Sequence, residues 1–360
     1  MHIALVVDPD RLVTDAAEVQ RLAVALAGEG VRVHRVLPPW TDEPPLARLI
    51  PASSFDFASS MLFRPSRLGA LSSALENDRP DVFVGFGARG FDAAAELAED
   101  LDAGLVAMVS TADELDAMPL RAHAERVDLV CAATAPIAVR ASRTVGEGRV
   151  SVLPLGIPVH ARGAATAPSP QSLAIAGSGR DDGAYRAIFR AIADVMPALP
   201  ELQVAIELPP GHDPKLWRLA REMGVQRVLN GVGSLESVRP LALACGAIAV
   251  PEPVHGVRTI VLEAMALGRA VVAMDDPYAD HLIDGVSAFV VQDRSAAEWT
   301  QLLTRALLSP DDARRVGDEA AARAAARFGS ARCAEQLADA CASIVRGPSI
   351  PFPGTAASGT

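Results

Sequence analysis

The chain has 360 residues and a formal net charge of −11. Single hydrophobic cores stop growing at roughly 250–300 residues, so this length predicts two domains. The acidic balance argues against a nucleic-acid-binding surface or a polybasic membrane patch. No apolar run approaches the about 18 residues that predict a transmembrane helix, although peripheral membrane contact is compatible with the sequence.

The cysteines and the start of the chain indicate a cytoplasmic protein. Cys131, Cys245, Cys333 and Cys341 form no C-x-x-C pair and have no histidine cluster near them. We therefore expect small buried thiols in a reducing compartment and no metal site. The opening MHIALVVDPD lacks the basic n-region of a signal peptide.

The first half alternates short β-branched runs with segments of helical spacing. This alternation predicts a doubly wound parallel sheet covered on both faces. The predicted strands are Ile3–Val7, Val31–Val36, Asp81–Phe86, Leu105–Val109, Val127–Cys131 and Val150–Leu153, and the predicted helices include Ala16–Ala27, Gly90–Ala98 and Pro136–Val145.

The segment PVHARGAATAPSP has no apolar period and predicts a linker, after which the alternation restarts. The expected strands are Ser172–Ala176, Gln203–Ile206, Arg227–Leu229, Ala247–Val250, Ala270–Ala273 and Ala288–Val291. The expected helices are Gly183–Met196, Pro214–Met223, Leu235–Ala244, Thr259–Ala266, Ala296–Leu308 and almost all of Asp311–Val345. We expect an N-terminal Rossmann-like domain at 1–158, a linker at 159–170, a C-terminal domain at 171–330, a closing helix at 331–346 and a disordered tail at 347–360. Ligands of open α/β sheets bind outside the carboxyl ends of the strands, so the cleft between the domains is the expected site.

One segment, from Pro251 to Gln292, narrows the function. It contains LEAMALG (Leu262–Gly268), then AVVA (Ala270–Ala273), then HLIDGVSAFVV (His281–Val291). This order and spacing resemble the donor-binding segment of retaining GT-B glycosyltransferases of family 4. The resemblance implies an α/β protein with two Rossmann-like domains facing a cleft, the N-terminal one for the acceptor and the C-terminal one for a nucleotide-sugar donor.

The resemblance implies two catalytic residues. Glu263 matches the glutamate that accepts hydrogen bonds from the ribose hydroxyls, as an ionised carboxylate can. The alternative is a helix-surface glutamate satisfied by an arginine. His255 stands where the family has a first glutamate beside the reacting sugar, and it could orient a sugar hydroxyl or assist proton transfer. The alternative is a loop histidine without a role.

Two loops are expected to bind the donor diphosphate. Backbone N–H groups of Gly256, Val257, Arg258 and Thr259 would point at phosphate or sugar from the start of a helix. The Arg258 side chain either reaches the diphosphate or is a solvated loop arginine.

The second loop is GSGRDDG, in which Gly179 and Arg180 match the family's G-R. The family's arginine grips the diphosphate together with a lysine a few residues later. Here Asp182 lies about where that lysine belongs, and the only lysine in the chain is Lys215. A solvated turn arginine is the alternative for Arg180.

The N-terminal half departs from the family pattern. DPDRLVTD (Asp8–Asp15) replaces the usual Gly-Gly loop, and VGFGARG and MVSTAD replace the acceptor-side histidines. Polar residues that could line the cleft instead are Asp8, Asp10, Arg11, Arg89 and Ser110.

The sequence therefore predicts a hexosyltransferase-type glycosyltransferase, retaining and metal-independent, that moves a sugar from a UDP- or GDP-sugar to an acceptor hydroxyl. No further cofactor is expected, and the acceptor could be a carbohydrate, a lipid or a small molecule. The alternative is a catalytically inactive GT-B-fold protein that serves as a binding or scaffolding subunit. A third hypothesis is another GT-B enzyme, such as a nucleotide-sugar epimerase or a phosphorylase.

Overall fold

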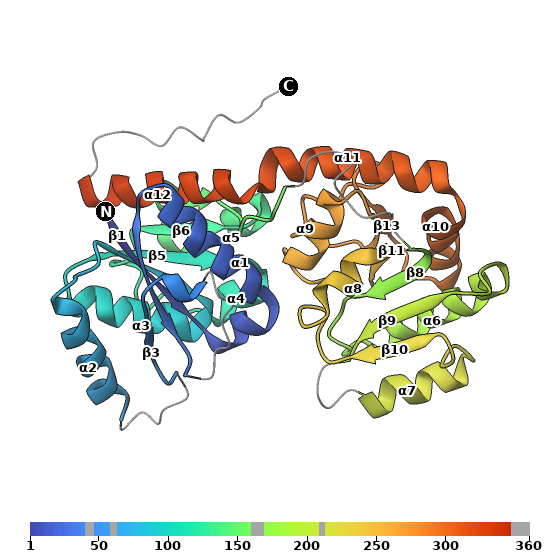
Figure 1. Ribbon diagram of the computed structural model, residues 1–360, viewed down its shortest axis with the longest axis horizontal. Helices are drawn as coiled ribbons and strands as arrows, with labels where there is room; N and C mark the ends of the chain where they lie inside the picture. The colour runs from blue at the N-terminus through green and yellow to red at the C-terminus, as the bar shows by residue number, and fades with distance from the viewer. Residues whose placement is uncertain (40–46, 58–62, 160–168, 209–212, 347–360) are drawn as a thin grey trace. The chain divides into compact units, whose positions relative to one another are not determined.

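The computed structural model describes residues 1–39, 47–57, 63–159, 169–208 and 213–346. The chain forms two compact units (Figure 1), one of Met1–Gly156 with the chain from Ser330 onward, and the other of Ile157–Gly329. Most of the predicted linker, 159–170, and all of the predicted tail, 347–360, lie outside the described residues.

The N-terminal unit is built on a seven-stranded sheet of order β3-β2-β1-β4-β5-β6-β7. Every neighbouring pair in it is parallel. Its strands are β1 (His2–Val7), β2 (Arg32–Leu37), β3 (Ala52–Ser54), β4 (Val82–Phe86), β5 (Gly104–Val109), β6 (Leu129–Ala132) and β7 (Val150–Val152). Its helices are α1 (Pro9–Gly28), α2 (Arg64–Glu76), α3 (Gly87–Asp100), α4 (Ala112–Ala117), α5 (Ala135–Val145) and α12 (Ser330–Arg346).

Alternate side chains of these strands enter cores on opposite faces of the sheet, as a pleated strand dictates. Ile3, Leu5 and Val7 of β1 share a buried core with α1 and α12. Helix α3 contacts β1, β4 and β5. The last helix of the chain is therefore part of the first unit, and it supplies buried residues that include Leu337 and Cys341.

The C-terminal unit repeats this strand order with a six-stranded parallel sheet, β10-β9-β8-β11-β12-β13. The strands are β8 (Ser169–Ile175), β9 (Gln203–Glu207), β10 (Leu229–Val232), β11 (Cys245–Val250), β12 (Ala270–Met274) and β13 (Phe289–Val291). The helices are α6 (Asp182–Val195), α7 (Asp213–Glu222), α8 (Arg239–Ala244), α9 (Thr259–Ala266), α10 (Ala296–Leu308) and α11 (Pro310–Phe328).

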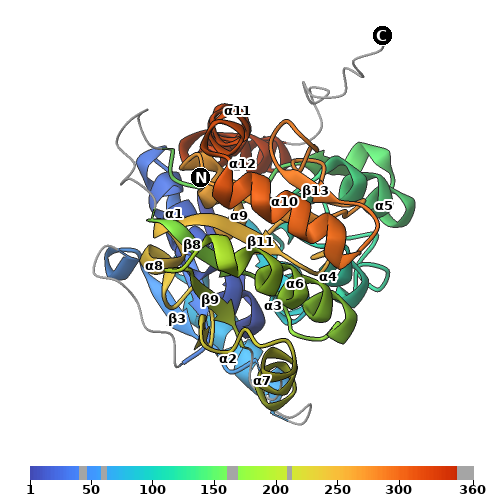
Figure 2. The same ribbon diagram turned by 90° about the vertical axis from the view of Figure 1, so that its right-hand side faces the viewer.

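Two helix layers cover this second sheet. Helices α6 and α10 lie side by side (Figure 2) and bury Phe189 and Trp299 against strand residues such as Ile175. Helix α9 packs on α11, and the turn after α9 approaches α11 so closely that position 317 must be glycine. A Cβ on Gly317 would lie 2.2 Å from the carbonyl oxygen of Gly268. The packing fixes the helix that carries the LEAMALG motif.

The predicted pair of parallel-sheet domains is confirmed, but some element boundaries were wrong. Strand β10 begins at Leu229 instead of Arg227, and α8 begins at Arg239 instead of Leu235. The stretch expected to be almost entirely helical, Asp311–Val345, contains α11 and α12, and the extended residue Gly329, with φ −61° and ψ 131°, separates them just before the closing helix expected at 331–346. The polar segment after β1 is helical from Pro9, since Pro suits the first helical position and Asp8 caps it.

Candidate active site

The carboxyl edge of the C-terminal sheet contains the switch point between β8 and β11, where the strand order reverses. In open α/β sheets, ligands bind in the crevice at this point. The two loops that border it are 176–181 after β8 and 251–258 after β11. Gly179, Arg180 and the predicted His255–Thr259 segment all lie in these loops or at the start of α9.

Glu263 lies in the middle of α9 and is only 5 % exposed, so it is not a surface residue. Its Oε2 accepts a hydrogen bond of 2.7 Å from Nε of Arg239, the first residue of α8. Arg239 also pairs with Glu236 in the turn before α8. The motif glutamate is thus a buried carboxylate held against an arginine from a neighbouring helix.

Arg180 has an exposed side chain, and within the described parts of the chain its guanidinium has no ion-pair partner. Its backbone is fixed, because the Arg180 N–H donates to Oε1 of Glu252 at 2.9 Å. Gly179 precedes it with φ +71°, a conformation that glycine adopts without strain. Asp182 is also exposed, two residues later.

The carboxylate of Glu252 accepts hydrogen bonds from several backbone N–H groups of this loop. Besides Arg180, the N–H groups of Ser178 and Asp181 donate to it, each at 2.6 Å, and the Ser178 hydroxyl donates at 2.9 Å. Gly177 keeps this region open, because a Cβ there would lie 2.4 Å from the Tyr185 hydroxyl and 3.1 Å from Oε2 of Glu252. Converging backbone N–H groups beside a helix N-terminus are a common anion-binding arrangement, and here the anion is internal.

Arg258 is committed to a second buried carboxylate. Its Nη1 and Nη2 contact the two oxygens of Glu207, at the end of β9, at 2.7 and 3.2 Å. The N–H groups of Gly177 and Leu235 also donate to Glu207. Arg258 is therefore not the solvated loop arginine of the alternative hypothesis, and its guanidinium ties α9 to the two neighbouring loops.

The remaining predicted residues surround the start of α9. His255 is half-buried with φ +53°, and its ring lies edge-on to Tyr278 at 6.2 Å between centroids. The N–H of Gly256 donates to Oδ2 of Asp276, from the loop after β12, at 3.2 Å. Val257 and Thr259 are buried. Glu263 and the two loops thus share one edge of one sheet.

The N-terminal unit has its own switch point, between β1 and β4, and it too is bridged by a carboxylate. Asp8 follows β1 and accepts hydrogen bonds from the backbone N–H of Arg89, at 2.8 Å, and from its Nη2, at 3.0 Å. Arg89 also pairs with Asp10. Gly87 allows this contact, because a Cβ there would lie 2.5 Å from Cβ of Asp8.

A second buried group lies beside this bridge. Nη1 of Arg11 contacts Asp15 at 3.0 Å and Glu114 at 3.4 Å, and its Nη2 donates to the Ser110 hydroxyl. Burial opposes the charge of Arg11, but Asp15 and Glu114 outweigh it and raise the pKa of Arg11. Burial also raises the pKa of Glu114, although Arg11 and the Ser110 N–H oppose that shift. The polar residues predicted to line the N-terminal edge are therefore largely paired with one another.

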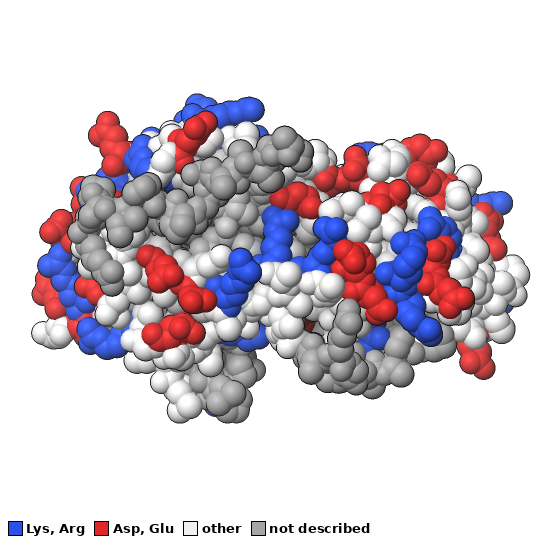
Figure 3. Space-filling view, turned by 90° about the horizontal axis from the view of Figure 1, so that it is seen from above, with Lys and Arg blue, Asp and Glu red and all other residues white. Residues whose placement is uncertain are grey.

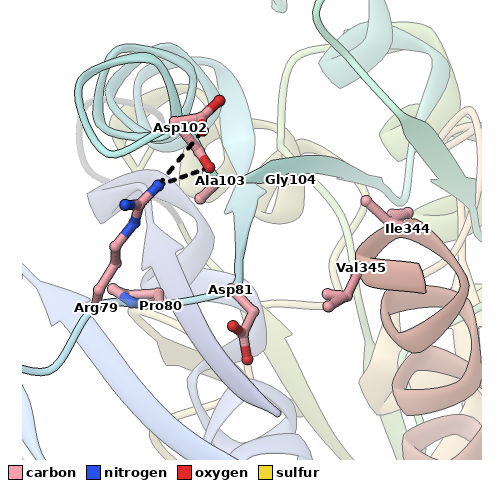
Figure 4. Close-up of a pocket in the computed structure, with 8 residues that line it drawn as sticks. All are labelled: Arg79, Pro80, Asp81, Asp102, Ala103, Gly104, Ile344 and Val345. Carbon is pink, nitrogen blue, oxygen red and sulfur yellow. Dashed lines mark hydrogen bonds and ion pairs between the residues drawn. The ribbon is translucent and has the colours of Figure 1, made fainter. Parts of the chain in front are cut away.

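A pocket of about 470 Å³ lies at the opposite, amino-terminal edge of the first sheet. Figure 4 shows an Arg79–Asp102 contact on one side of it and Ile344 and Val345 of α12 on the other. Nη2 of Arg79 donates to the Asp102 carbonyl at 2.8 Å, and Asp81 accepts from the His2 N–H. Because ligands of such sheets bind at the carboxyl edge, we assign this pocket no part in the chemistry.

On the face in Figure 3, acidic and basic side chains are interspersed. Among the described helices, none has the length and hydrophobicity that crossing a membrane requires. Within the same residues, no group of three or more His, Cys, Asp or Glu side chains could hold a metal ion.

Sequence reasoning missed four residues of the C-terminal edge. They are Glu207, Glu252, Arg239 and Asp276. A signal existed for two of them, since Glu207 ends a buried strand and Glu252 follows one closely, at the edge where ligands bind. Arg239 gave none, because its contact with Glu263 joins two helices.

Both units have the Rossmann-like strand order 3-2-1-4-5-6, counted from the first strand of each, and the N-terminal unit adds a seventh strand. Residues 172–309 match the family model described as "Glycosyl transferases group 1". This match begins within β8, ends just after α10 and includes every predicted donor-site residue. No curated protein sequence matches the chain.

Solved structures share the fold over almost the whole chain. Anabaena HepE in complex with UDP and glucose is 15% identical, with a TM-score of 0.75, covering 95% of this chain and 99% of that one. Sucrose-phosphate synthase from Thermosynechococcus elongatus is 16% identical, with a TM-score of 0.73 and coverages of 94% and 98%. UDP-GlcNAc 2-epimerase from Neisseria meningitidis is 12% identical, with a TM-score of 0.61 and coverages of 96% and 100%. The predicted resemblance to GT-B glycosyltransferases is confirmed by the family model for the C-terminal unit, and the fold is confirmed for both units.

Proposed function

We propose that the chain is a glycosyltransferase that moves a sugar, most simply a hexose, from a UDP- or GDP-sugar to an acceptor hydroxyl. The observation that carries this proposal is Glu263, a buried carboxylate at the ligand-binding edge of a domain that matches the glycosyltransferase family model. The structure of Anabaena HepE with UDP-glucose supports a uridine nucleotide as the first donor to test. The four buried free cysteines are consistent with a reducing compartment, so we place the reaction in the cytoplasm.

The residues divide the work by charge. Glu263 accepts hydrogen bonds from the ribose hydroxyls, and the exposed guanidinium of Arg180 contacts the diphosphate. His255 lies beside the sugar. Arg258, paired with Glu207, supports both loops and brings its backbone N–H, with that of Thr259, to the phosphate side of α9. Arg180 and these N–H groups stabilise the negative charge that develops on the leaving diphosphate.

In the proposed retaining, metal-independent reaction, the bond between the anomeric carbon and the diphosphate oxygen breaks. The acceptor hydroxyl oxygen then bonds to the same face of that carbon, and its proton passes to the departing phosphate oxygen. The products are a glycoside and a nucleoside diphosphate. No lysine takes part in this scheme, and the carboxylate of Asp182 stays outside the diphosphate contact.

The second candidate is a GT-B-fold binding subunit without turnover. The internal carboxylates Glu252 and Asp8 favour it, because each occupies backbone N–H groups at a switch point where a ligand would bind. The epimerase similarity shows only that the fold serves another reaction as well.

Isothermal titration with UDP and with GDP tests the donor site in the wild type, in Glu263→Ala and in Glu319→Ala, an exposed glutamate of α11. We expect one nucleotide to bind, with affinity about tenfold or more weaker in Glu263→Ala and unchanged in Glu319→Ala. Release of that nucleotide from its sugar conjugates then separates the two candidates. Turnover with any donor supports the transferase, and binding without turnover supports the binding subunit.

A further inference from the structure

Arg239 connects the proposed ribose ligand to a second acidic residue. Its guanidinium contacts Glu263 through Nε and Glu236 through Nη1. The three side chains are 12, 6 and 10% exposed for Arg239, Glu263 and Glu236. One cation is therefore shared by a buried carboxylate of α9, Glu263, and a largely buried one, Glu236, in the turn before α8.

The backbone that carries Arg239 is fixed on both sides. Pro240 lies in the first turn of α8. In the preceding turn, the Ser234 hydroxyl accepts from the Glu236 N–H at 3.2 Å, and Leu235 donates its N–H to Glu207 at 3.1 Å. The guanidinium consequently approaches Glu263 from an anchored position.

We propose that Arg239 is a positioning residue that orients the Glu263 carboxylate for the two hydroxyls of the donor ribose, a role that rests on the proposed function. The Arg239 Nε contact uses one of the about four lone-pair sites that a carboxylate offers, so it does not by itself exclude hydroxyl donors. The planar guanidinium fixes the plane of the carboxylate in a way that a lysine ammonium does not. Glu263 then loses little conformational freedom when the nucleotide binds.

The test is the preference for ribose over deoxyribose. Titration of UDP and 2′-deoxy-UDP, or of the GDP pair where GDP is the nucleotide that binds, gives this ratio for each variant. We expect the wild type to prefer the ribonucleotide about tenfold or more, because a lost hydroxyl leaves a buried acceptor unsatisfied. In Arg239→Gln the ratio falls towards one, with the deoxynucleotide affinity changed by less than about twofold.

Removing Arg239 alone would leave two neighbouring carboxylates, Glu263 and Glu236, without their shared cation. The double variant Glu236→Gln/Arg239→Gln removes one charge of each sign and is therefore measured beside the single variant. Thermal melting checks that both variants are folded. Arg239→Lys should recover part of the ratio. Arg305→Gln, which removes the pair with Asp312 in the same unit, should leave it unchanged.

Equal weakening of both nucleotides in the folded Arg239 variants, or an unaltered ratio, would overturn the positioning role and leave the proposed function intact. A wild type that binds neither UDP nor GDP would instead overturn the proposed function. We expect the preference for ribose over deoxyribose to fall equally in Arg239→Gln, in Glu263→Ala and in the variant that carries both changes. That result supports a role in which Arg239 acts through Glu263.

Discussion

The switch points of the two units have the same strand order, and an internal carboxylate bridges each of them, but the bridges run in opposite directions. In the N-terminal unit Asp8 follows β1 and accepts hydrogen bonds from Arg89, which comes shortly after β4. In the C-terminal unit the carboxylate lies on the other side of the switch point: Glu252 follows β11 and accepts hydrogen bonds from the loop after β8. A glycine lies beside the carboxylate in each case: a Cβ on Gly87 would clash with Asp8 itself, and a Cβ on Gly177 would clash with the Tyr185 hydroxyl and lie 3.1 Å from Glu252.

The difference lies in what neutralises each carboxylate. Asp8 engages the guanidinium of Arg89, and Arg11 nearby is shared by Asp15 and Glu114. Glu252 instead takes backbone N–H groups and a hydroxyl, so the guanidinium of Arg180 stays exposed. The C-terminal edge therefore keeps a cationic side chain for a ligand, while the cations of the N-terminal edge serve its own carboxylates.

The largest expected effect comes from removing Arg258, because this would leave the Glu207 carboxylate buried with half of its donors lost. Arg258→Met should destabilise the C-terminal unit by about 3–5 kcal/mol, as a buried charge without its partner is costly. Urea unfolding followed by the fluorescence of Trp217 and Trp299 measures this, in a Trp40→Phe background so that both remaining tryptophans lie in this unit.

Arg294→Met serves as the control, because the Arg294 side chain is 61% exposed and its ion pair with Asp181 is long, at 3.6 Å. We expect it to cost less than about 0.5 kcal/mol. A comparably small loss for Arg258→Met would mean that Glu207 is satisfied by its two backbone N–H groups alone. The diphosphate would then regain Arg258 as a candidate ligand.

The next effect is the pH dependence of stability, which a titrating group in each unit shifts in the opposite direction. Burial lowers the pKa of His281 to about 4, with Asp280 and Arg327 as the facing charges, and its Nδ1 has no hydrogen-bond partner among the described residues. Between pH 6.5 and about 4, His281 is therefore protonated in the unfolded chain but neutral in the folded unit. Stability from this group is complete above pH 6.5 and falls by about 3 kcal/mol as the pH drops to 4.

Glu114 in the N-terminal unit acts in the opposite direction. Its pKa is raised by burial, so the folded state holds the proton more tightly, and its contribution is lost as the pH rises through that raised pKa. Urea unfolding of the Trp40→Phe protein between pH 4 and 7 should show the acid loss in the C-terminal unit, and His281→Gln should flatten it. An unchanged slope in His281→Gln would assign the loss to other groups.

Periodicity predicted both sheets, because buried parallel strands are continuous apolar runs and the helices between them show clear amphipathic spacing. Strand β3, with three residues, and helices α2 and α4 were not expected. In helix α2, Leu68, Leu71 and Leu75 keep helical spacing and are buried, but the segment holds few other apolar residues, so the pattern is weak. Short or weakly patterned elements take their structure from tertiary contacts, which one sequence does not display.

The candidate site divides in the same way. The motif around Glu263 and the G-R pair at Arg180 could be found from sequence, since each occupies a fixed place relative to a strand. The partners of these residues could not. Glu207 lies 51 positions from Arg258, and Glu252 lies 72 from Arg180. Sequence spacing describes neighbours on one element, whereas these pairs form only where the sheet brings two loops together.

A third prediction concerns removal of the Glu252 carboxylate, which bridges the two loops of the C-terminal unit. Glu252→Ser should destabilise this unit by about 2 kcal/mol, because the N–H groups of Ser178, Arg180 and Asp181 lose their acceptor, although water can reach this loop. The vacated N–H groups beside α6 should then bind an anion. Inorganic phosphate should raise the melting temperature of Glu252→Ser more than that of the wild type. Equal shifts in the two proteins would show that the loop holds its shape only around the glutamate.

The smallest expected effect tests the bridge in the N-terminal unit. Arg89→Gln removes the side-chain contacts to Asp8 and Asp10 but keeps the backbone N–H that donates to Asp8. The Arg89 side chain is 42% exposed, so solvent screens the pair and the loss should be only about 0.5–1 kcal/mol, reduced further by salt. Thermal unfolding at low and high ionic strength measures it. A larger, salt-independent loss would mean that Asp8 depends on Arg89 as fully as Glu207 depends on Arg258, and the two edges would then be alike in how they neutralise their buried carboxylates.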